Sequence, residues 1–191
     1  MVKKAIVVEG GAMRGVFASG VLDAFMEQNY KLFDFAIGVS AGTSNLIGYL
    51  TDYPHRSINI ITKLATCKRF FDPTRFIKGG DLIDVKWLFE ESNRLYPVDE
   101  KKLFAEHPKM VEAMLHRTEN YNESLAFIRN PPEDARIRVI APPDNFHVQR
   151  LSMRKSVLLE GYEMGLAEGR AHLKNLAGAH GLDRENCHFC I

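Results

Sequence analysis

The chain contains the stretch Phe35-Ala36-Ile37-Gly38-Val39-Ser40-Ala41-Gly42, a short apolar run that leads into a serine flanked by Gly38 and Gly42. A G-x-S-x-G pentapeptide is typical of a strained turn between a strand and a helix, from which the serine hydroxyl projects at the edge of a sheet. Glycines are needed around that turn because the crowded backbone leaves no room for larger side chains. The pattern therefore predicts a nucleophile elbow with Gly38 and Gly42 on its two sides and Ser40 as the candidate nucleophile.

A second glycine-rich element lies upstream, at Glu9-Gly10-Gly11-Ala12-Met13-Arg14-Gly15. It follows the β-branched run 5–8, which is typical of a strand buried on both faces of a parallel sheet. It precedes residues 14–28, in which apolar side chains recur at the spacing of one helix face. This element is therefore expected to connect a first strand to a first helix.

Such a connection can supply the hydrogen-bond donors that stabilise the oxyanion formed during acyl transfer. The backbone N–H groups of Gly10, Gly11 and Ala12 would lie at a helix N-terminus, where they can stabilise an oxyanion that develops during attack by Ser40. Arg14 would orient this loop or bind an anionic headgroup. These four residues are the candidate oxyanion hole.

The order of the predicted elements indicates an α/β fold. A second strand over 35–39 and a helix after Ser40 complete a strand-helix-strand-helix opening, which predicts a parallel sheet. The later part of the chain adds a helix over 110–128, a strand over 136–141 and a final helix over 158–173. We expect a single domain over 1–191 with three layers, in which helices flank a mostly parallel central sheet. Glycines that recur every four residues along the final helix predict close packing of that helix against the sheet.

Composition limits the possible partners. The chain has 191 residues, 46% of them hydrophobic, with a net charge of +1, which suits one globular domain and gives no general attraction to nucleic acid. No apolar stretch is long enough to span a bilayer. The first apolar run stops at Glu9, which is too early for a signal peptide, and three cysteines do not suggest an oxidised scaffold. These features favour a cytoplasmic protein.

Residues 68–78 interleave basic and aromatic side chains in the sequence Lys-Arg-Phe-Phe-Asp-Pro-Thr-Arg-Phe-Ile-Lys. One interpretation is a long loop with its aromatic side chains tucked underneath. The other is a lid or interfacial patch, because aromatic side chains enter the headgroup region while lysine and arginine contact lipid phosphates. The second interpretation predicts peripheral contact with the inner face of a membrane.

Three other interpretations of these motifs are less favoured. A dinucleotide site expects Gly-x-Gly-x-x-Gly and an acidic residue at the end of the next strand, and this chain has neither. An α/β-hydrolase triad expects several strands before its nucleophile, whereas Ser40 follows only the second. Cys187 and Cys190 form one Cys-x-x-Cys pair near His180, which is too little to indicate a metal site. We therefore expect neither metal nor cofactor.

The two motifs together resemble those of the patatin-like phospholipase family, most clearly from residue 2 to about 45 and more loosely to 103. The resemblance implies lipid acyl hydrolysis by a Ser-Asp dyad without histidine, in which the glycine-rich loop is the oxyanion hole and Ser40 the nucleophile. In that family the base is the aspartate of an Asp-Gly-Gly or Asp-Gly-Ala motif. Ala12 takes the place of the usual third glycine.

The base aspartate is unknown, because none of the ten aspartates of this chain is followed by glycine. Two hypotheses account for this. Either the chain has lost catalysis and kept lipid binding, or a segment that carries the aspartate is missing between about Phe104 and Pro108. A nucleotide-binding domain is a third, less favoured, alternative.

Overall fold

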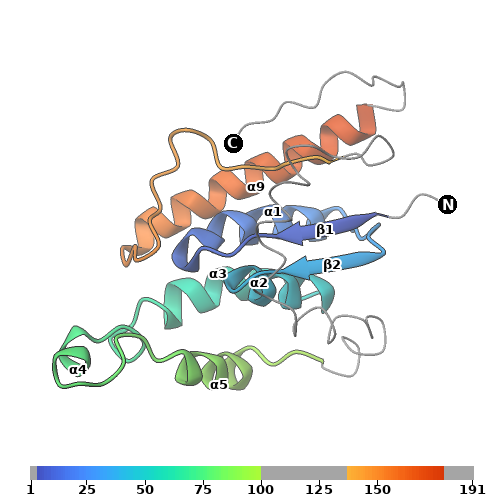
Figure 1. The fold of residues 1–191 in the computed structure, drawn as a ribbon. Coiled ribbons are helices and arrows are strands. Elements are labelled where there is room, and N and C mark those ends of the chain that lie inside the picture. The colour runs from blue at the N-terminus through green and yellow to red at the C-terminus, as the bar shows by residue number, and fades with distance from the viewer. Residues whose placement is uncertain (1–3, 100–136, 179–191) are drawn as a thin grey trace.

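The computed structural model describes residues 4–99 and 137–178 (Figure 1). The first half of the described chain alternates strands and helices, and the second part is dominated by one long helix. The elements are β1 (Ala5–Val8), η1 (Ala12–Gly15), α1 (Val16–Glu27), β2 (Phe35–Gly38), α2 (Ala41–Leu50), α3 (Arg56–Asn59), η2 (Ile60–Leu64), α4 (Pro73–Ile77), α5 (Val85–Leu95) and α9 (Lys155–Gly178).

The predicted opening is present. β1 and β2 pair in parallel, with Ala5 opposite Phe35 and Val8 opposite Gly38. The ladder continues for one further bond, in which the Val39 N–H donates to the Val8 carbonyl oxygen at 3.0 Å. Both strands therefore end at the same edge of the sheet, where the glycine-rich loop and the elbow follow.

The fold is α/β, with a two-stranded parallel sheet and mostly helices in the described residues. The expectation that the first strand is buried on both faces is wrong. Val7 is 61% exposed and Ile37 is 44% exposed, whereas Val8 is buried. Helices pack on one face of the sheet, and within the described residues no second layer covers the other. The three-layer arrangement is thus not seen here.

The glycines of α9 pack against another helix, which corrects the expected contact with the sheet. A Cβ atom at Gly165 would lie 2.0 Å from the Phe17 carbonyl oxygen, and one at Gly20 would lie 2.2 Å from the Tyr162 carbonyl oxygen. α1 and α9 therefore touch backbone to backbone. Glycine is needed because any side chain at these positions would separate the helices.

The hydrophobic core lies where α1 contacts its neighbours. One cluster joins α1 to α2 through Phe25, Leu46 and Tyr49, and a second joins α1 to α9 through Val16 and Leu158. α1 is buried along most of its length because it is covered by α2 on one side and α9 on the other. This central helix carries the glycine-rich loop at its N-terminal end.

Two predicted elements differ or cannot be compared. Residues 137–141 form no strand; Ile140 instead packs against the core cluster around α1. An alternating pattern predicts an extended segment, but a strand also needs a ladder of hydrogen bonds to a neighbour. The predicted helix over 110–128 and the proposed break between Phe104 and Pro108 lie outside the described residues.

α4 and α5 form an arm on the side of the molecule away from α9 (Figure 1). Phe71 and Ile83 form an antiparallel bridge across the base of α4, and α5 packs mainly on η2. Residues 68–78 combine both expected features: Phe70 packs underneath against the core cluster of α1 and α9, whereas Phe76 on the short helix α4 is exposed. No helix among the described residues is both long and apolar enough to cross a membrane.

Candidate active site

Ser40 lies on a strained turn between β2 and α2, as predicted for a nucleophile elbow. Its backbone angles are φ 52° and ψ −121°, outside the regions that residues with a side chain normally adopt. The turn is held by the Gly42 N–H, which donates to the Val39 carbonyl oxygen at 2.9 Å, and by the Thr43 N–H, which donates to the Ser40 carbonyl oxygen at 3.0 Å. Ser40 is exposed, and its hydroxyl does not cap α2.

The glycines on both sides of Ser40 are required by close backbone contacts. A Cβ atom at Gly38 would lie 2.6 Å from the Thr43 Cα, and one at Gly42 would lie 2.2 Å from the Val8 carbonyl oxygen. The Thr43 hydroxyl also donates to the Gly38 carbonyl oxygen at 2.7 Å. The elbow is thus packed directly against the end of β1.

The glycine-rich loop lies beside Ser40. A Cβ atom at Gly10 would lie 2.6 Å from the Val39 carbonyl oxygen and 3.0 Å from the Ser40 Cβ. Gly11 and Ala12 have positive φ angles of 152° and 53°. Within the described residues, the N–H groups of Gly10, Gly11 and Ala12 have no recorded acceptor. Of these three residues, Gly10 is the one packed against Ser40, and a backbone donor beside an exposed serine is what oxyanion stabilisation requires.

Arg14 ties this loop to the segment before α9. Its guanidinium lies over the Phe146 ring at 5.2 Å and donates to the Val148 carbonyl oxygen at 3.2 Å. The neighbouring Met13 N–H donates to the Arg150 carbonyl oxygen at 3.3 Å. These contacts hold Arg14 against the segment before α9, and its role in orienting the loop stays a prediction.

Asn45 fixes the loop from the other side, although no motif in the sequence predicts a role for this residue. Its side-chain amide is buried and donates to the Gly15 carbonyl oxygen at 2.8 Å. Gly15 in turn lies against Ala41, because a Cβ atom there would be 3.3 Å from the Ala41 Cβ. An asparagine one turn into α2 is unremarkable as a pattern, and only the folded chain brings it to the loop.

Within the described residues, no hydrogen bond joins the Ser40 hydroxyl to a carboxylate that could act as its base. Asp34 accepts the Lys4 N–H at the start of β2, about 20 Å from Ser40 at roughly 3.3 Å per strand residue. Asp52 pairs with Lys31 beyond the far end of α2. Asp84 caps α5 and pairs with Arg69 at 3.1 Å. Asp81 is exposed near α4. All four lie in the half of the chain that contains Ser40, and none of them is hydrogen-bonded to it.

A buried polar cluster lies at the other end of α2. Asp23 is 4% exposed and accepts the Tyr162 hydroxyl at 2.7 Å and the His55 backbone N–H at 3.1 Å. Burial raises the pKa of the Asp23 carboxyl, and these donors offset part of that rise. The His55 Nδ1 lies 2.8 Å from the Tyr162 hydroxyl. α2 has ten residues, about 15 Å at 1.5 Å each, so His55 is far from Ser40.

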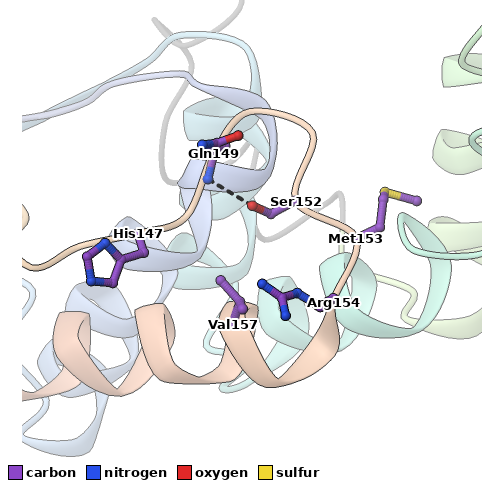
Figure 2. Close-up of a pocket in the computed structure, with 6 residues that line it drawn as sticks. All are labelled: His147, Gln149, Ser152, Met153, Arg154 and Val157. Atoms are coloured by element: carbon purple, nitrogen blue, oxygen red, sulfur yellow. Dashed lines mark hydrogen bonds between the residues drawn. The ribbon is translucent and has the colours of Figure 1, made fainter.

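A shallow pocket lies between the segment before α9 and the first turn of that helix (Figure 2). The Gln149 N–H donates to the Ser152 hydroxyl at 2.8 Å across its upper rim. None of the candidate site residues lines this pocket. Its lining residues are His147, Gln149, Ser152, Met153, Arg154 and Val157.

Among residues 4–99 and 137–178, no group of three or more His, Cys, Asp or Glu side chains could hold a metal ion. The Cys187-x-x-Cys190 pair and His180 lie outside the described residues. Cys67 is a free, half-buried thiol.

Comparison with known proteins gives two matches. Residues 107–179 match a family model described as a domain of unknown function, DUF6363. The chain is also 43% identical over 94 residues to the "Uncharacterized protein YjjU" of Escherichia coli (strain K12), a match that covers 49% of this chain and 26% of the relative. The chain thus spans about a quarter of the length of this curated relative. No solved structure matches.

These comparisons overturn the resemblance to the patatin-like phospholipases. The family model that matches is a domain of unknown function, the relative is uncharacterised, and no patatin family model matches. Two short glycine motifs were therefore not enough to assign the family. What the chain retains is the geometry of the elbow and its loop, which is independent of any family name.

Proposed function

We propose that this chain is a serine acyl hydrolase that cleaves carboxylic ester bonds of lipids. The backbone of Ser40, at φ 52° and ψ −121°, carries the proposal. A residue with a side chain costs of order 1–3 kcal/mol in such a conformation, and strain of this kind clusters at functional sites. Here the strained residue is an exposed serine, and it is packed against Gly10 of the glycine-rich loop.

The reaction follows from this placement. The Ser40 Oγ attacks the acyl carbonyl carbon while a base takes its proton, and the N–H groups of Gly10, Gly11 and Ala12 bind the oxyanion. The alcohol then leaves with that proton, and water releases the acyl group from Ser40 in the same way. Each oxyanion donor is worth about 3 kcal/mol of transition-state stabilisation.

The base is proposed to be an aspartate that the described residues do not supply, so that Ser40 works in a Ser-Asp dyad. The same missing part would extend β1 and β2 into a larger sheet with helices on both faces. The support for this is the open face of the sheet at Val7 and Ile37, because parallel sheets are normally covered on both sides. Neither a metal nor a cofactor is part of the proposal.

Lipid esters are the proposed substrates because apolar side chains are concentrated on the arm formed by α4 and α5. Of the thirteen large hydrophobic side chains that are exposed in residues 4–99 and 137–178, six lie between residues 76 and 95. Such a surface suits a protein that meets its substrate from the side of a membrane. The expected location is the cytoplasm, at the inner face of the membrane.

A second candidate function is lipid binding without turnover. The observation in its favour is that, within the described residues, no carboxylate is hydrogen-bonded to the Ser40 hydroxyl. A chain without a base would keep the oxyanion loop and the apolar surface but leave the hydroxyl unactivated. Vesicle binding without ester hydrolysis would be its signature.

The test is covalent labelling of the intact chain with a fluorophosphonate, read by mass spectrometry. An activated Ser40 should give one adduct, which Ser40→Ala abolishes. Ser44→Ala is the matched control, because Ser44 is also exposed and lies one turn further along α2. Labelling should be unchanged in this control. A folded wild-type chain that takes no label would contradict the hydrolase and favour lipid binding alone.

Gly10→Ala tests the oxyanion loop separately. The added methyl group would lie 2.6 Å from the Val39 carbonyl oxygen and push the loop away from Ser40. We expect the labelling rate to fall by about 10²- to 10³-fold. Gly48→Ala is the control, because a Cβ there would have ordinary contacts of 3.5 Å or more. Equal labelling of Gly10→Ala and wild type would exclude the loop as the oxyanion hole.

A further inference from the structure

The end of the arm carries two apolar side chains in solvent. Phe76 is 59% exposed and Ile77 is 83% exposed, and both lie on α4 next to the exposed Lys78. These three residues are called the α4 tip. An exposed isoleucine alone needs no explanation, but adjacent large apolar side chains at the end of a projecting arm indicate a contact surface.

The helix that carries the tip is fixed at both ends. Asp72 caps its N-terminus by accepting the N–H groups of Thr74 at 2.9 Å and Arg75 at 3.2 Å. At the other end Gly79, with φ 85°, donates to the Phe76 carbonyl oxygen at 3.0 Å, and Gly80 donates to that of Arg75 at 3.0 Å. This pair of bonds is a Schellman motif, which stops a helix sharply.

Arg75 fastens the helix to the chain on both sides of it. Its guanidinium donates to the carbonyl oxygens of Asp81 at 2.7 Å, Arg69 at 3.2 Å and Phe70 at 3.2 Å. The Asp84 N–H also donates to the Phe70 carbonyl oxygen at 2.9 Å. The tip is therefore held in its exposed position, and ordering it on binding would cost little conformational entropy.

The surroundings of the tip carry positive charge. Residues 68–80 contain four basic side chains and one acidic one, Asp72. Asp72 caps the helix, and Arg69 and Arg75 both pair with Asp84, at 3.1 and 3.8 Å, next to the exposed Asp81. The positive charge that these acids do not offset is that of Lys68 and Lys78. Lys78 has no recorded ion-pair partner within the described residues. Lysines beside an apolar tip are complementary to an anionic lipid bilayer.

We infer that the α4 tip inserts into the headgroup region of an anionic bilayer, with Phe76 and Ile77 in the acyl boundary and Lys78 at the phosphates. A stable protein interface buries about 800 Å² on each partner, which two side chains and a lysine do not provide. Interfacial insertion needs only a few apolar side chains and nearby basic ones. The inference adds a membrane-binding surface to the proposed lipid hydrolase. It rests on that proposed function for the reason why the chain would bind a bilayer.

The test is flotation of the full-length chain with vesicles, using a Ser40→Ala background so that no lipid is hydrolysed. Vesicles of phosphatidylcholine with phosphatidylglycerol should bind the chain, and binding should weaken with salt and on pure phosphatidylcholine. Phe76→Ser with Ile77→Ser should lower the partition coefficient at least tenfold. Leu32→Ser with Leu159→Ser is the matched control, because these side chains are 60% and 48% exposed and lie off the arm.

A second readout follows insertion itself. Phe76→Trp in a Trp87→Phe background should shift its emission to the blue on anionic vesicles and be quenched by brominated acyl chains. Any of three results would overturn the inference: no binding of the folded chain, an equal loss in the Leu32/Leu159 control, or a tip variant that loses self-association instead of vesicle binding. Fluorophosphonate labelling of the unaltered chain is measured separately. Vesicle binding without labelling would contradict the proposed hydrolase activity and still support insertion of the α4 tip.

Discussion

Asp23 lies on α1, and its carboxylate is enclosed by α9 and the turn before α3. The stability of the folded chain depends on the hydrogen-bond donors around this carboxylate. Burial raises its pKa, while the Tyr162 hydroxyl, the nearest donor at 2.7 Å, lowers it. A carboxyl whose pKa is raised on folding binds its proton more tightly in the folded state. Stability therefore falls as pH rises from the unfolded pKa to the folded pKa, and stays lower above it.

Tyr162→Phe is expected to make this fall steeper. Removing the Tyr162 hydroxyl leaves the ionised carboxylate with one hydrogen-bond donor fewer, so the Asp23 pKa should rise further. The loss of folding stability should be largest at pH values at which Asp23 is ionised. We expect a loss of about 1–3 kcal/mol at pH 7 and clearly less at pH 4, measured by urea unfolding. Tyr49→Phe is the control, since the Tyr49 hydroxyl donates to the neutral Tyr30 carbonyl oxygen and its loss should not vary between these pH values.

At the scale of elements, the contact between α1 and α9 determines the shape of the described fold. Gly165 brings α9 against the backbone of α1, and the exposed pair formed by Arg170 and Glu27 closes the contact at 2.7 Å. The Arg170 guanidinium lowers the pKa of the Glu27 carboxyl, chiefly through this hydrogen bond. An exposed pair of this kind adds little stability. The close backbone contact at Gly165 is therefore expected to contribute more to the stability of the α1–α9 packing than the Arg170–Glu27 pair does.

Gly165→Ala tests that expectation. Alanine favours a helix by about 1 kcal/mol over glycine, but its methyl group would lie 2.0 Å from the Phe17 carbonyl oxygen. Overpacking should outweigh the helix propensity and leave a net loss of about 1–3 kcal/mol in the free energy of unfolding. Ala167→Gly on the exposed face of α9 gives the propensity term alone. A stabilised Gly165→Ala chain would mean that the helices are not in backbone contact.

At the scale of the whole molecule, the sheet has one covered face and one open face in the described residues. Leu22 of α1 is buried in the core cluster on the covered side, whereas Ile37 of β2 is 44% exposed. Substitutions on the two sides should therefore differ strongly in cost.

Ile37→Thr keeps a β-branched side chain and should change the free energy of unfolding by no more than about 0.5 kcal/mol. Leu22→Ala should cost about 2–5 kcal/mol, because it leaves a cavity in the core. Urea unfolding of the full-length chain measures both. A cost of 2 kcal/mol or more for Ile37→Thr would show that this face is covered after all, and would support the three-layer arrangement.

Local sequence determined the elements around the candidate site. The apolar run before Ser40, the glycines on both sides of it and the helical spacing after residue 14 predicted β1, α1, β2, α2 and the elbow between them. These signals are reliable because each depends on neighbours in the chain: steric crowding at a turn, or the period of one face. The final helix was predicted for the same reason.

Only the tertiary structure decided what those elements touch. Gly165 was assigned to a contact with the sheet and lies against α1, and residues 137–141 lack the neighbour that would make them a strand. Asn45 reaches the loop from α2, and Arg14 of the loop reaches Val148 in a distant part of the chain. A side-chain pattern states which face of an element is apolar, but not which partner covers it. Which element covers an apolar face depends on how well the two surfaces fit and on how closely their backbones approach. Both involve residues far apart in the chain, so they are defined only in the folded structure.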